Sequence, residues 1–142
     1  MTKETLATLL FILFSLAIAT EDIKTGAVSR LAFMGAFPVF FAFVLLRSAR
    51  HSLLAALTGA MVGLIAFLLA YFISAKKLGL ADVWYSALIG MVLGPRNWYL
   101  AIGSACIGGI VYILVSKRQS IPFIPLMAIG SIVVGIIKGT SL

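Results

Sequence analysis

The chemistry that this sequence could perform depends on two aspartates. Four of the 142 residues are acidic, and of these only Asp22 and Asp82 are aspartates. Two carboxyl groups a few ångströms apart cannot easily both ionise, so they share a proton and titrate as a pair. The ionised member can take a proton from a water that attacks a carbonyl, and the protonated member can donate to the leaving amine. Such a pair could hydrolyse a peptide bond without metal or cofactor.

Each aspartate also has a purely structural interpretation. Asp82 precedes an apolar run, where a carboxylate often caps a helix, and Asp22 lies beside Glu21 and Lys24 and could be a solvated loop charge. However, Asp82 is the only charged residue between positions 78 and 94, and a helix beginning after it would be too short to cross a membrane. We therefore expect Asp82 to be submerged in the protein, with Asp22 as its partner.

The composition indicates that membrane helices position this pair. Hydrophobic residues make up 63% of the chain and charged residues 11%, whereas soluble domains have about 25% charged residues. The mean hydropathy of +1.19 agrees with this. The net charge of +7 does not indicate a nucleic-acid partner, because the eleven Lys and Arg residues form short clusters between apolar runs. Such clusters are typical of loops that contact membrane lipids.

Charges and prolines divide the chain into six apolar stretches, at residues 5–20, 31–46, 52–74, 78–93, 98–116 and 121–137. In lipid the backbone must satisfy its own hydrogen bonds, so these stretches are predicted to be helices. The predicted fold is an all-α polytopic membrane protein with about six transmembrane helices, in a single domain over residues 1–142. Six alternating spans place both aspartates on one side of the membrane. The Lys and Arg residues, five on one side and six on the other, do not determine the orientation.

Two further patterns have more than one interpretation. Lys3, an apolar centre and Ala17-Ile18-Ala19 could form a cleaved signal peptide, although a retained first helix is simpler because further spans follow it. Small residues recur at helix-packing spacing, in the G-x-x-x-G pairs Gly59/Gly63 and Gly90/Gly94. Such pairs let helices approach closely, but glycine is also common in membrane helices generally.

Three segments together resemble a known family. Gly79-Leu80-Ala81-Asp82, followed by apolar and small residues up to Gly94, is similar to a G-x-G-D signature. The segment from Asp22 to Val28-Ser29-Arg30 resembles a second aspartate motif, and Ile121-Pro122-Phe123-Ile124-Pro125 resembles a late P-F-x-P element. In order and spacing these segments resemble the type IV prepilin peptidases, which are membrane aspartic proteases of the GxGD type.

The resemblance implies a leader peptidase that acts on prepilin or pseudopilin proteins of type IV pili or protein secretion. The substrate would have a short basic leader and be cut just before its apolar helix. Asp22 and Asp82 would be catalytic, and five residues would support the motifs or bind substrate: Gly79, Ala81, Pro122, Phe123 and Pro125. Small residues at positions 79 and 81 would let a substrate strand approach Asp82, or would simply form a tight loop.

The resemblance also implies a multi-pass protein of the inner or plasma membrane with its catalytic side in the cytoplasm; a homo-oligomer is an open alternative. The chain departs from the family pattern at Ala81, where the second signature glycine is expected, and at Ser29, where proline is usual. With Cys106 as its one cysteine, the chain cannot form the paired C-x-x-C zinc module of the longer members. We therefore expect the peptidase-only form, without methyltransferase activity.

Other functions remain as alternatives. Buried acids also serve as ion sites in small proton-coupled transporters or carrier subunits, and a membrane scaffold could carry the acids incidentally. A serine protease would have to use Ser104 and His51, but the histidine is expected on the side opposite the aspartates. A zinc protease is excluded because the chain has no H-E-x-x-H sequence.

The basic pairs Lys76-Lys77 and Lys117-Arg118 are interpreted as anchors to anionic lipid headgroups.

Overall fold

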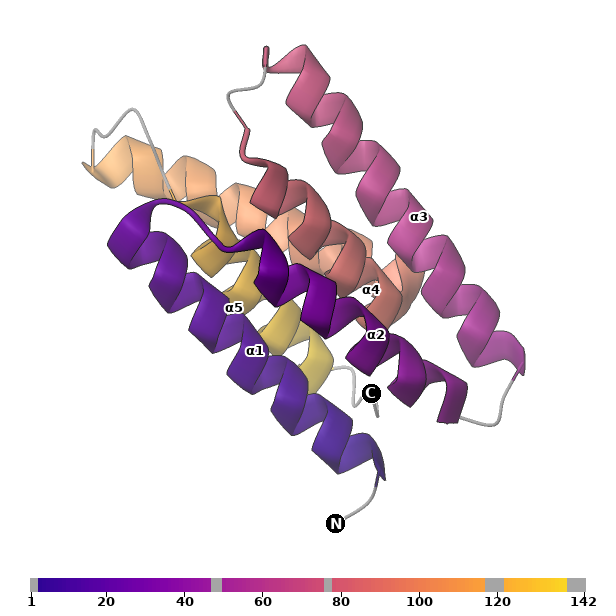
Figure 1. The fold of residues 1–142 in the computed structure, drawn as a ribbon. Helices are drawn as coiled ribbons and strands as arrows, with labels where there is room; N and C mark the ends of the chain where they lie inside the picture. The colour runs from indigo at the N-terminus through magenta and orange to yellow at the C-terminus, as the bar shows by residue number, and fades with distance from the viewer. Residues whose placement is uncertain (1–2, 47–49, 76–77, 117–121, 138–142) are drawn as a thin grey trace.

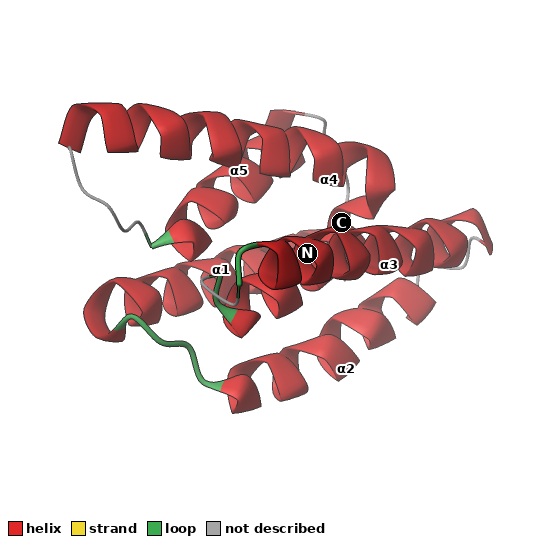
Figure 2. Ribbon diagram, turned by 90° about the horizontal axis from the view of Figure 1, so that it is seen from above, coloured by secondary structure: helices red, strands yellow, loops and turns green. Residues whose placement is uncertain are grey.

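The computed structural model describes residues 3–46, 50–75, 78–116 and 122–137 of the chain. Within these ranges every regular element is a helix, joined by short turns or bends, so the all-α prediction is confirmed. Figures 1 and 2 show that the helices pack into one bundle. Their bounds are α1 (Lys3–Thr25), α2 (Arg30–Leu46), α3 (Arg50–Ile73), α4 (Leu80–Ser116) and α5 (Phe123–Ile137).

Helix α4 consists of two helical segments joined by a sharp turn at Gly94. This glycine has φ 77° and ψ 169°, a conformation that is essentially restricted to glycine, and Pro95 after it lacks an N–H for the helical ladder. The Trp98 Nε1–H donates to the Ser86 hydroxyl at 2.9 Å across twelve residues, which would span about 18 Å in a straight helix. The second segment therefore runs back beside the first, as Figure 1 shows.

The turn gives six helical segments among the described residues, and these overlap the six apolar stretches predicted from the sequence, although α1 continues to Thr25, beyond the predicted end at residue 20. The turn itself falls between the predicted stretches 78–93 and 98–116. In the part of the chain that the structure describes, two helices are long and apolar enough to cross a membrane, over Leu53–Ile73 and Leu80–Ser116, and the turn at Gly94 divides the second of them. That every segment crosses the membrane stays a prediction.

Helix α3 packs on the first segment of α4 by direct backbone contact. A Cβ atom on Gly59 would overlap the carbonyl of Gly90, and one on Gly63 would overlap the carbonyl of Ser86. The Ser86 hydroxyl donates to the Gly63 carbonyl at 3.2 Å, in addition to accepting from Trp98. The interpretation as specific packing sites is confirmed for Gly59, Gly63 and Gly90, whereas Gly94 forms the turn and makes no such close contact.

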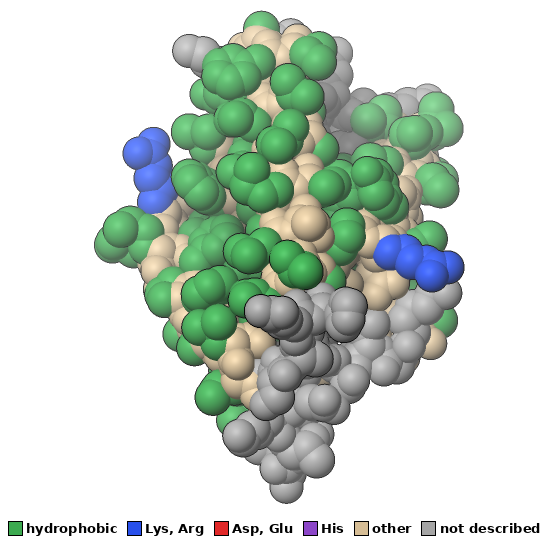
Figure 3. All heavy atoms as spheres, turned by 90° about the vertical axis from the view of Figure 1, so that its right-hand side faces the viewer, with side chains coloured by type: hydrophobic (Ala, Val, Ile, Leu, Met, Phe, Trp, Pro, Cys, Tyr) green, Lys and Arg blue, Asp and Glu red, His purple; other side chains and the backbone are tan. Residues whose placement is uncertain are grey.

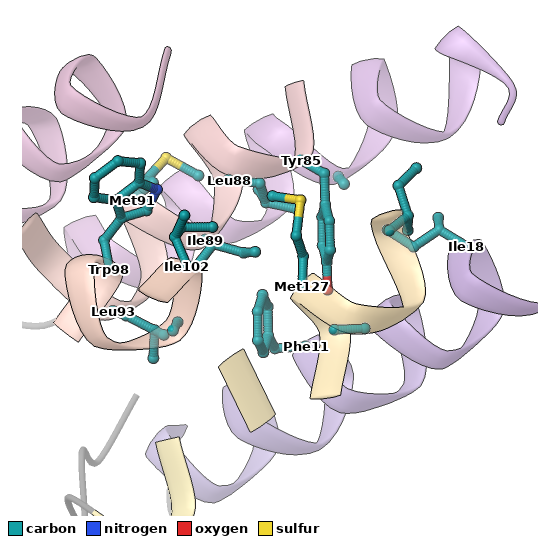
Figure 4. Packing of buried hydrophobic residues seen from close by; sticks show 14 of the residues in the cluster. Phe11, Ile18, Tyr85, Leu88, Ile89, Met91, Leu93, Trp98, Ile102 and Met127 are labelled. Atoms are coloured by element: carbon teal, nitrogen blue, oxygen red, sulfur yellow. The ribbon is translucent and has the colours of Figure 1, made fainter. Parts of the chain in front are cut away.

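Helix α5 lies between α1 and α4 and packs against both. Its buried residue Met127 belongs to the same core cluster as Tyr85 of α4 and Phe11 of α1, which are shown in Figure 4. Within the described residues, no close backbone contact joins α1 directly to α4. Their relative placement therefore depends on α5 and α2, which both pack on α1 and α4, and on long side chains that cross between them.

The outer surface of the bundle is apolar. Each helix exposes large hydrophobic side chains, for example Leu13, Leu31, Ile73, Val115 and Ile137, all more than half exposed. Among the described residues on the face in Figure 3, hydrophobic side chains predominate and a few Lys or Arg side chains stand out from it. Such a surface would be a liability in water and is suited to contact with lipid chains. The protein is therefore a membrane protein.

Candidate active site

Asp82 is buried in the first turn of α4, with 8% of its surface exposed. Its Oδ2 accepts the backbone N–H of Gly79 at 3.1 Å, and its own N–H donates to the Gly79 carbonyl, also at 3.1 Å. This reciprocal arrangement joins the third residue of a helix to its N-cap. The carboxylate thus helps to cap α4, but from the third helical position, whereas the structural interpretation places Asp82 before the helix. The same hydrogen bonds hold it in one orientation at the end of the bundle.

Asp22 lies in the last turn of α1, beyond the apolar stretch 5–20. The helix ends here because Gly26, at φ 65°, donates its N–H to the Asp22 carbonyl at 2.8 Å, a left-handed ending that favours glycine. The Oδ2 of Asp22 is buried and accepts no hydrogen bond from the described residues. Burial raises the pKa of this carboxyl group.

The two aspartates line one pocket, which has a volume of about 440 Å³. The charge of Asp22 acts on the Asp82 carboxyl group, so the two side chains interact electrostatically. The walls of the pocket come from the end of α1, the α1–α2 connection, residues 78–81 and the start of α5. The fold thus brings together groups that are far apart in the sequence.

Most of the predicted supporting residues also lie in this pocket. Four of the five line it: Gly79, Ala81, Pro122 and Phe123. The fifth, Pro125, lines an adjoining pocket of about 470 Å³ that also contacts Asp22. The structure therefore places both aspartates and the start of α5 around two neighbouring pockets that share Asp22, Gly26 and Pro122.

Sequence reasoning did not single out three further lining residues, Arg30, Phe33 and Trp84. Arg30 opens α2 and brings a positive charge to a pocket with two carboxylates, and it could have been found because it closes the first aspartate motif. Trp84 follows Asp82 by two positions, but an aromatic residue in an apolar run is not distinctive. Phe33 offers no sequence signal beyond its hydrophobicity.

Hydrogen bonds from α1 hold the α1–α2 connection, which forms one wall of the pocket. The Glu21 Oε1 accepts the Ser29 N–H at 3.3 Å, and the Thr25 hydroxyl donates to the Ala27 carbonyl at 2.6 Å. A proline at position 29, which the resemblance leads one to expect, could not donate the first of these bonds. Serine at position 29 therefore allows an additional hydrogen bond that holds the α1–α2 connection to α1.

The described structure covers only part of the residues of the alternative chemistries. Ser104 lies within α4 and donates to the Ala101 carbonyl at 2.8 Å, while the side chain of His51 lies outside the described residues. The basic pairs at 76–77 and 117–118 also lie outside them. Within the described parts of the chain, no three His, Cys, Asp or Glu residues are grouped as a metal site would require.

Comparison with known protein families identifies a match. Residues 9–114, more than half of the chain, match the type IV leader peptidase family. The matched segment contains both aspartates and ends before the Pro122–Pro125 element. No curated protein matches the chain, and no solved structure matches it either.

Proposed function

From the premise that the chain belongs to the type IV leader peptidase family, we propose that it is an aspartic endopeptidase that removes the leader of type IV prepilin-like proteins within the membrane. Membership of the family makes it a peptidase. The observation that supports the aspartic mechanism is that Asp22 and Asp82, from different helices, line one pocket and interact electrostatically.

In the proposed mechanism the two carboxyl groups share one proton. The ionised group takes a proton from a water molecule as the water attacks the scissile carbonyl, and the other donates to the oxyanion or the leaving amine. The Gly79 N–H, which bonds to Asp82, keeps that carboxylate oriented during the reaction. The unpaired buried oxygen of Asp22 is free to bind the water or the shared proton.

The pocket also accounts for the proposed substrate. Gly79 and Ala81 present backbone with little side-chain bulk beside Asp82, so an extended peptide strand can pass close to the carboxyl groups. The apolar helix that follows the cleavage point in a prepilin or pseudopilin would lie in lipid beside the bundle. Pro122, Phe123 and Pro125 at the start of α5 would contact this substrate.

The topology belongs to the same proposal. We assign six membrane-spanning segments with a variant G-L-A-D signature in one peptidase domain, which would need no cofactor. Both aspartates would lie on the cytoplasmic side of the plasma or inner membrane, in an enzyme of pilus assembly or protein secretion. A proton-coupled carrier would also use buried acids, but the family match favours the peptidase.

Two substitutions test the proposal most directly. Asp22→Asn and Asp82→Asn keep the size of each side chain and remove its ability to exchange a proton. Each variant should abolish cleavage of a co-expressed prepilin, measured as the loss of the shortened band on a gel, while remaining in the membrane fraction. Cleavage retained by either variant would exclude the two-aspartate mechanism.

Glu21→Gln is the matched control for these variants. It removes a neighbouring carboxylate but keeps an oxygen that can accept the Ser29 N–H. This variant should still cleave the prepilin. If it were as inactive as Asp22→Asn, the loss would reflect general damage to this end of α1.

A further inference from the structure

Three hydroxyl groups meet in the core of the bundle, away from the pocket. Tyr85 of α4, Ser15 of α1 and Ser131 of α5 are completely buried, each with 0% of its surface exposed. The Ser15 and Ser131 side chains lie beside the Tyr85 phenol. Figure 4 shows the Tyr85 side chain extending from α4 towards α5. We call these residues the hydroxyl cluster.

The hydrogen bonds of the hydroxyl cluster are incomplete among the described residues. Ser131 donates to the Ala128 carbonyl at 2.9 Å, but the Tyr85 hydroxyl and the Ser15 Oγ have no hydrogen-bond partner there. Leaving a buried polar group unpaired costs about 1–3 kcal/mol. Buried polar groups of this kind are commonly paired through an ordered internal water that makes about three hydrogen bonds.

The hydroxyl cluster lies on the helix faces that carry the aspartates. Tyr85 follows Asp82 by three residues and Ser15 precedes Asp22 by seven, spacings that place each pair on one side of its helix. Within the described residues α1 and α4 have no close backbone contact, so their mutual positioning comes from α2 and α5, which pack on both, and from side chains that cross between them. Tyr85 is a long side chain from α4 that reaches a residue of α1.

We propose that Tyr85, Ser15 and Ser131 bind an internal water, and that this hydrogen-bonded site sets the spacing between α1 and α4 that brings Asp22 and Asp82 together. Tyr85 is then a positioning residue, since it does not line the pocket that contains the two aspartates. The inference rests on the proposed two-aspartate function. The spacing itself can be measured without any cleavage.

The first experiment measures this spacing in the full chain. Asp22→Cys and Asp82→Cys are combined with Cys106→Ser, and the rate of cross-linking by a short bifunctional thiol reagent is followed in membranes. Adding Tyr85→Phe, or independently Ser15→Ala, should lower this rate several-fold. An unchanged rate in both would overturn the proposal.

Ser86→Ala is the matched control for the cross-linking experiment. Ser86 is another completely buried hydroxyl of α4, but it bonds to Gly63 of α3 and to Trp98. Its loss should lower thermal stability and leave the cross-linking rate unchanged. If Ser86→Ala slowed cross-linking as much as Tyr85→Phe, the effect would be general loosening and the proposal would fail.

The second experiment separates positioning from stability in the enzyme with both aspartates. Tyr85→Phe should lower kcat for leader cleavage by about tenfold with KM unchanged, since small misplacements of reacting groups are costly. Removing all three hydroxyls together leaves none unpaired, so stability should recover while kcat stays low. If kcat recovered in that triple variant, the hydroxyl cluster would affect only stability, and the proposed positioning role would be wrong.

The two experiments distinguish the two hypotheses. If the protein cleaves a prepilin, Asp82→Asn does not, and Tyr85→Phe keeps full kcat, only the positioning role is wrong. If the protein with both aspartates cleaves no prepilin but Tyr85→Phe and Ser15→Ala still slow cross-linking, the proposed function is wrong and the spacing role stands.

Discussion

At the scale of single residues, the orientation of Asp82 depends on the small residue that precedes its helix. A Cβ atom at position 79 would lie 3.1 Å from the Asp82 Oδ2, closer than ordinary van der Waals contact, so the carboxylate would have to move. We expect Gly79→Ala to lower kcat for leader cleavage by about tenfold. Steady-state kinetics on a prepilin peptide measures this. Gly103→Ala, where a Cβ meets nothing within 4 Å, is the control, and equal kcat in the two variants would contradict the prediction.

The burial of Asp22 predicts a pH dependence. Burial raises the pKa of this carboxyl group, so it ionises only at a higher pH than an exposed aspartate, whose pKa is about 3.9. In the proposed mechanism Asp22 must be ionised to act as the base, so the peptidase loses activity as the pH falls through the raised pKa of this group. The acidic limb of kcat/KM should therefore lie above the ordinary aspartate range and move little with salt, because its cause is desolvation. A limb at or below about pH 4 would argue against this.

Residue types predicted part of the site and missed the rest for identifiable reasons. The two aspartates stand out because charge is rare in apolar runs, and the segments containing Gly79 and Pro122 stand out by their pattern. Tyr85 and Ser15 could not be found in this way, since a hydroxyl within an apolar run has no distinctive spacing. Only the packing of three helices shows that these two residues meet.

At the scale of elements, the contact between α3 and α4 depends on the absence of side chains. Gly59→Ala would place a methyl group against the Gly90 carbonyl, which cannot move without separating the helices. We expect a loss of about 1–3 kcal/mol, as for other overpacked sites, seen as a lower Tm in detergent. Gly35→Ala adds a methyl group with nothing within 4 Å and should be neutral or slightly stabilising. A Tm for Gly59→Ala equal to that of Gly35→Ala would refute the contact.

The elements themselves were largely predictable from the sequence. Apolar runs separated by charges and prolines predicted each helical segment, because in lipid an unpaired backbone is too costly for any irregular structure. The reversal of chain direction within α4 was harder to predict from the sequence. Pro95 marks an interruption, but only the φ of 77° at Gly94 makes that interruption a turn rather than a kink.

At the scale of the whole molecule, the site depends on α5 although the aspartates lie elsewhere. A Cβ on Gly130 would collide with the Ala101 carbonyl and the Ser104 hydroxyl, so Gly130→Val should push α5 away from the second segment of α4. Because α5 packs on both α1 and α4, we expect kcat to fall while the protein remains in the membrane fraction. Cleavage assays on membranes matched for protein content measure this. Wild-type kcat in Gly130→Val would show that the site does not depend on α5.

The placement of α5 has a consequence for biosynthesis. Both aspartates leave the ribosome well before α5, the helix that packs between α1 and α4. Asp82 lies in the first turn of α4, whereas α5 begins only at Phe123. A nascent chain inserted up to the end of α4 would therefore contain the two proposed catalytic aspartates without the helix that aligns them. On the proposed mechanism, cleavage would begin only after α5 is made and inserted, which would protect neighbouring proteins at the insertion machinery from premature cutting.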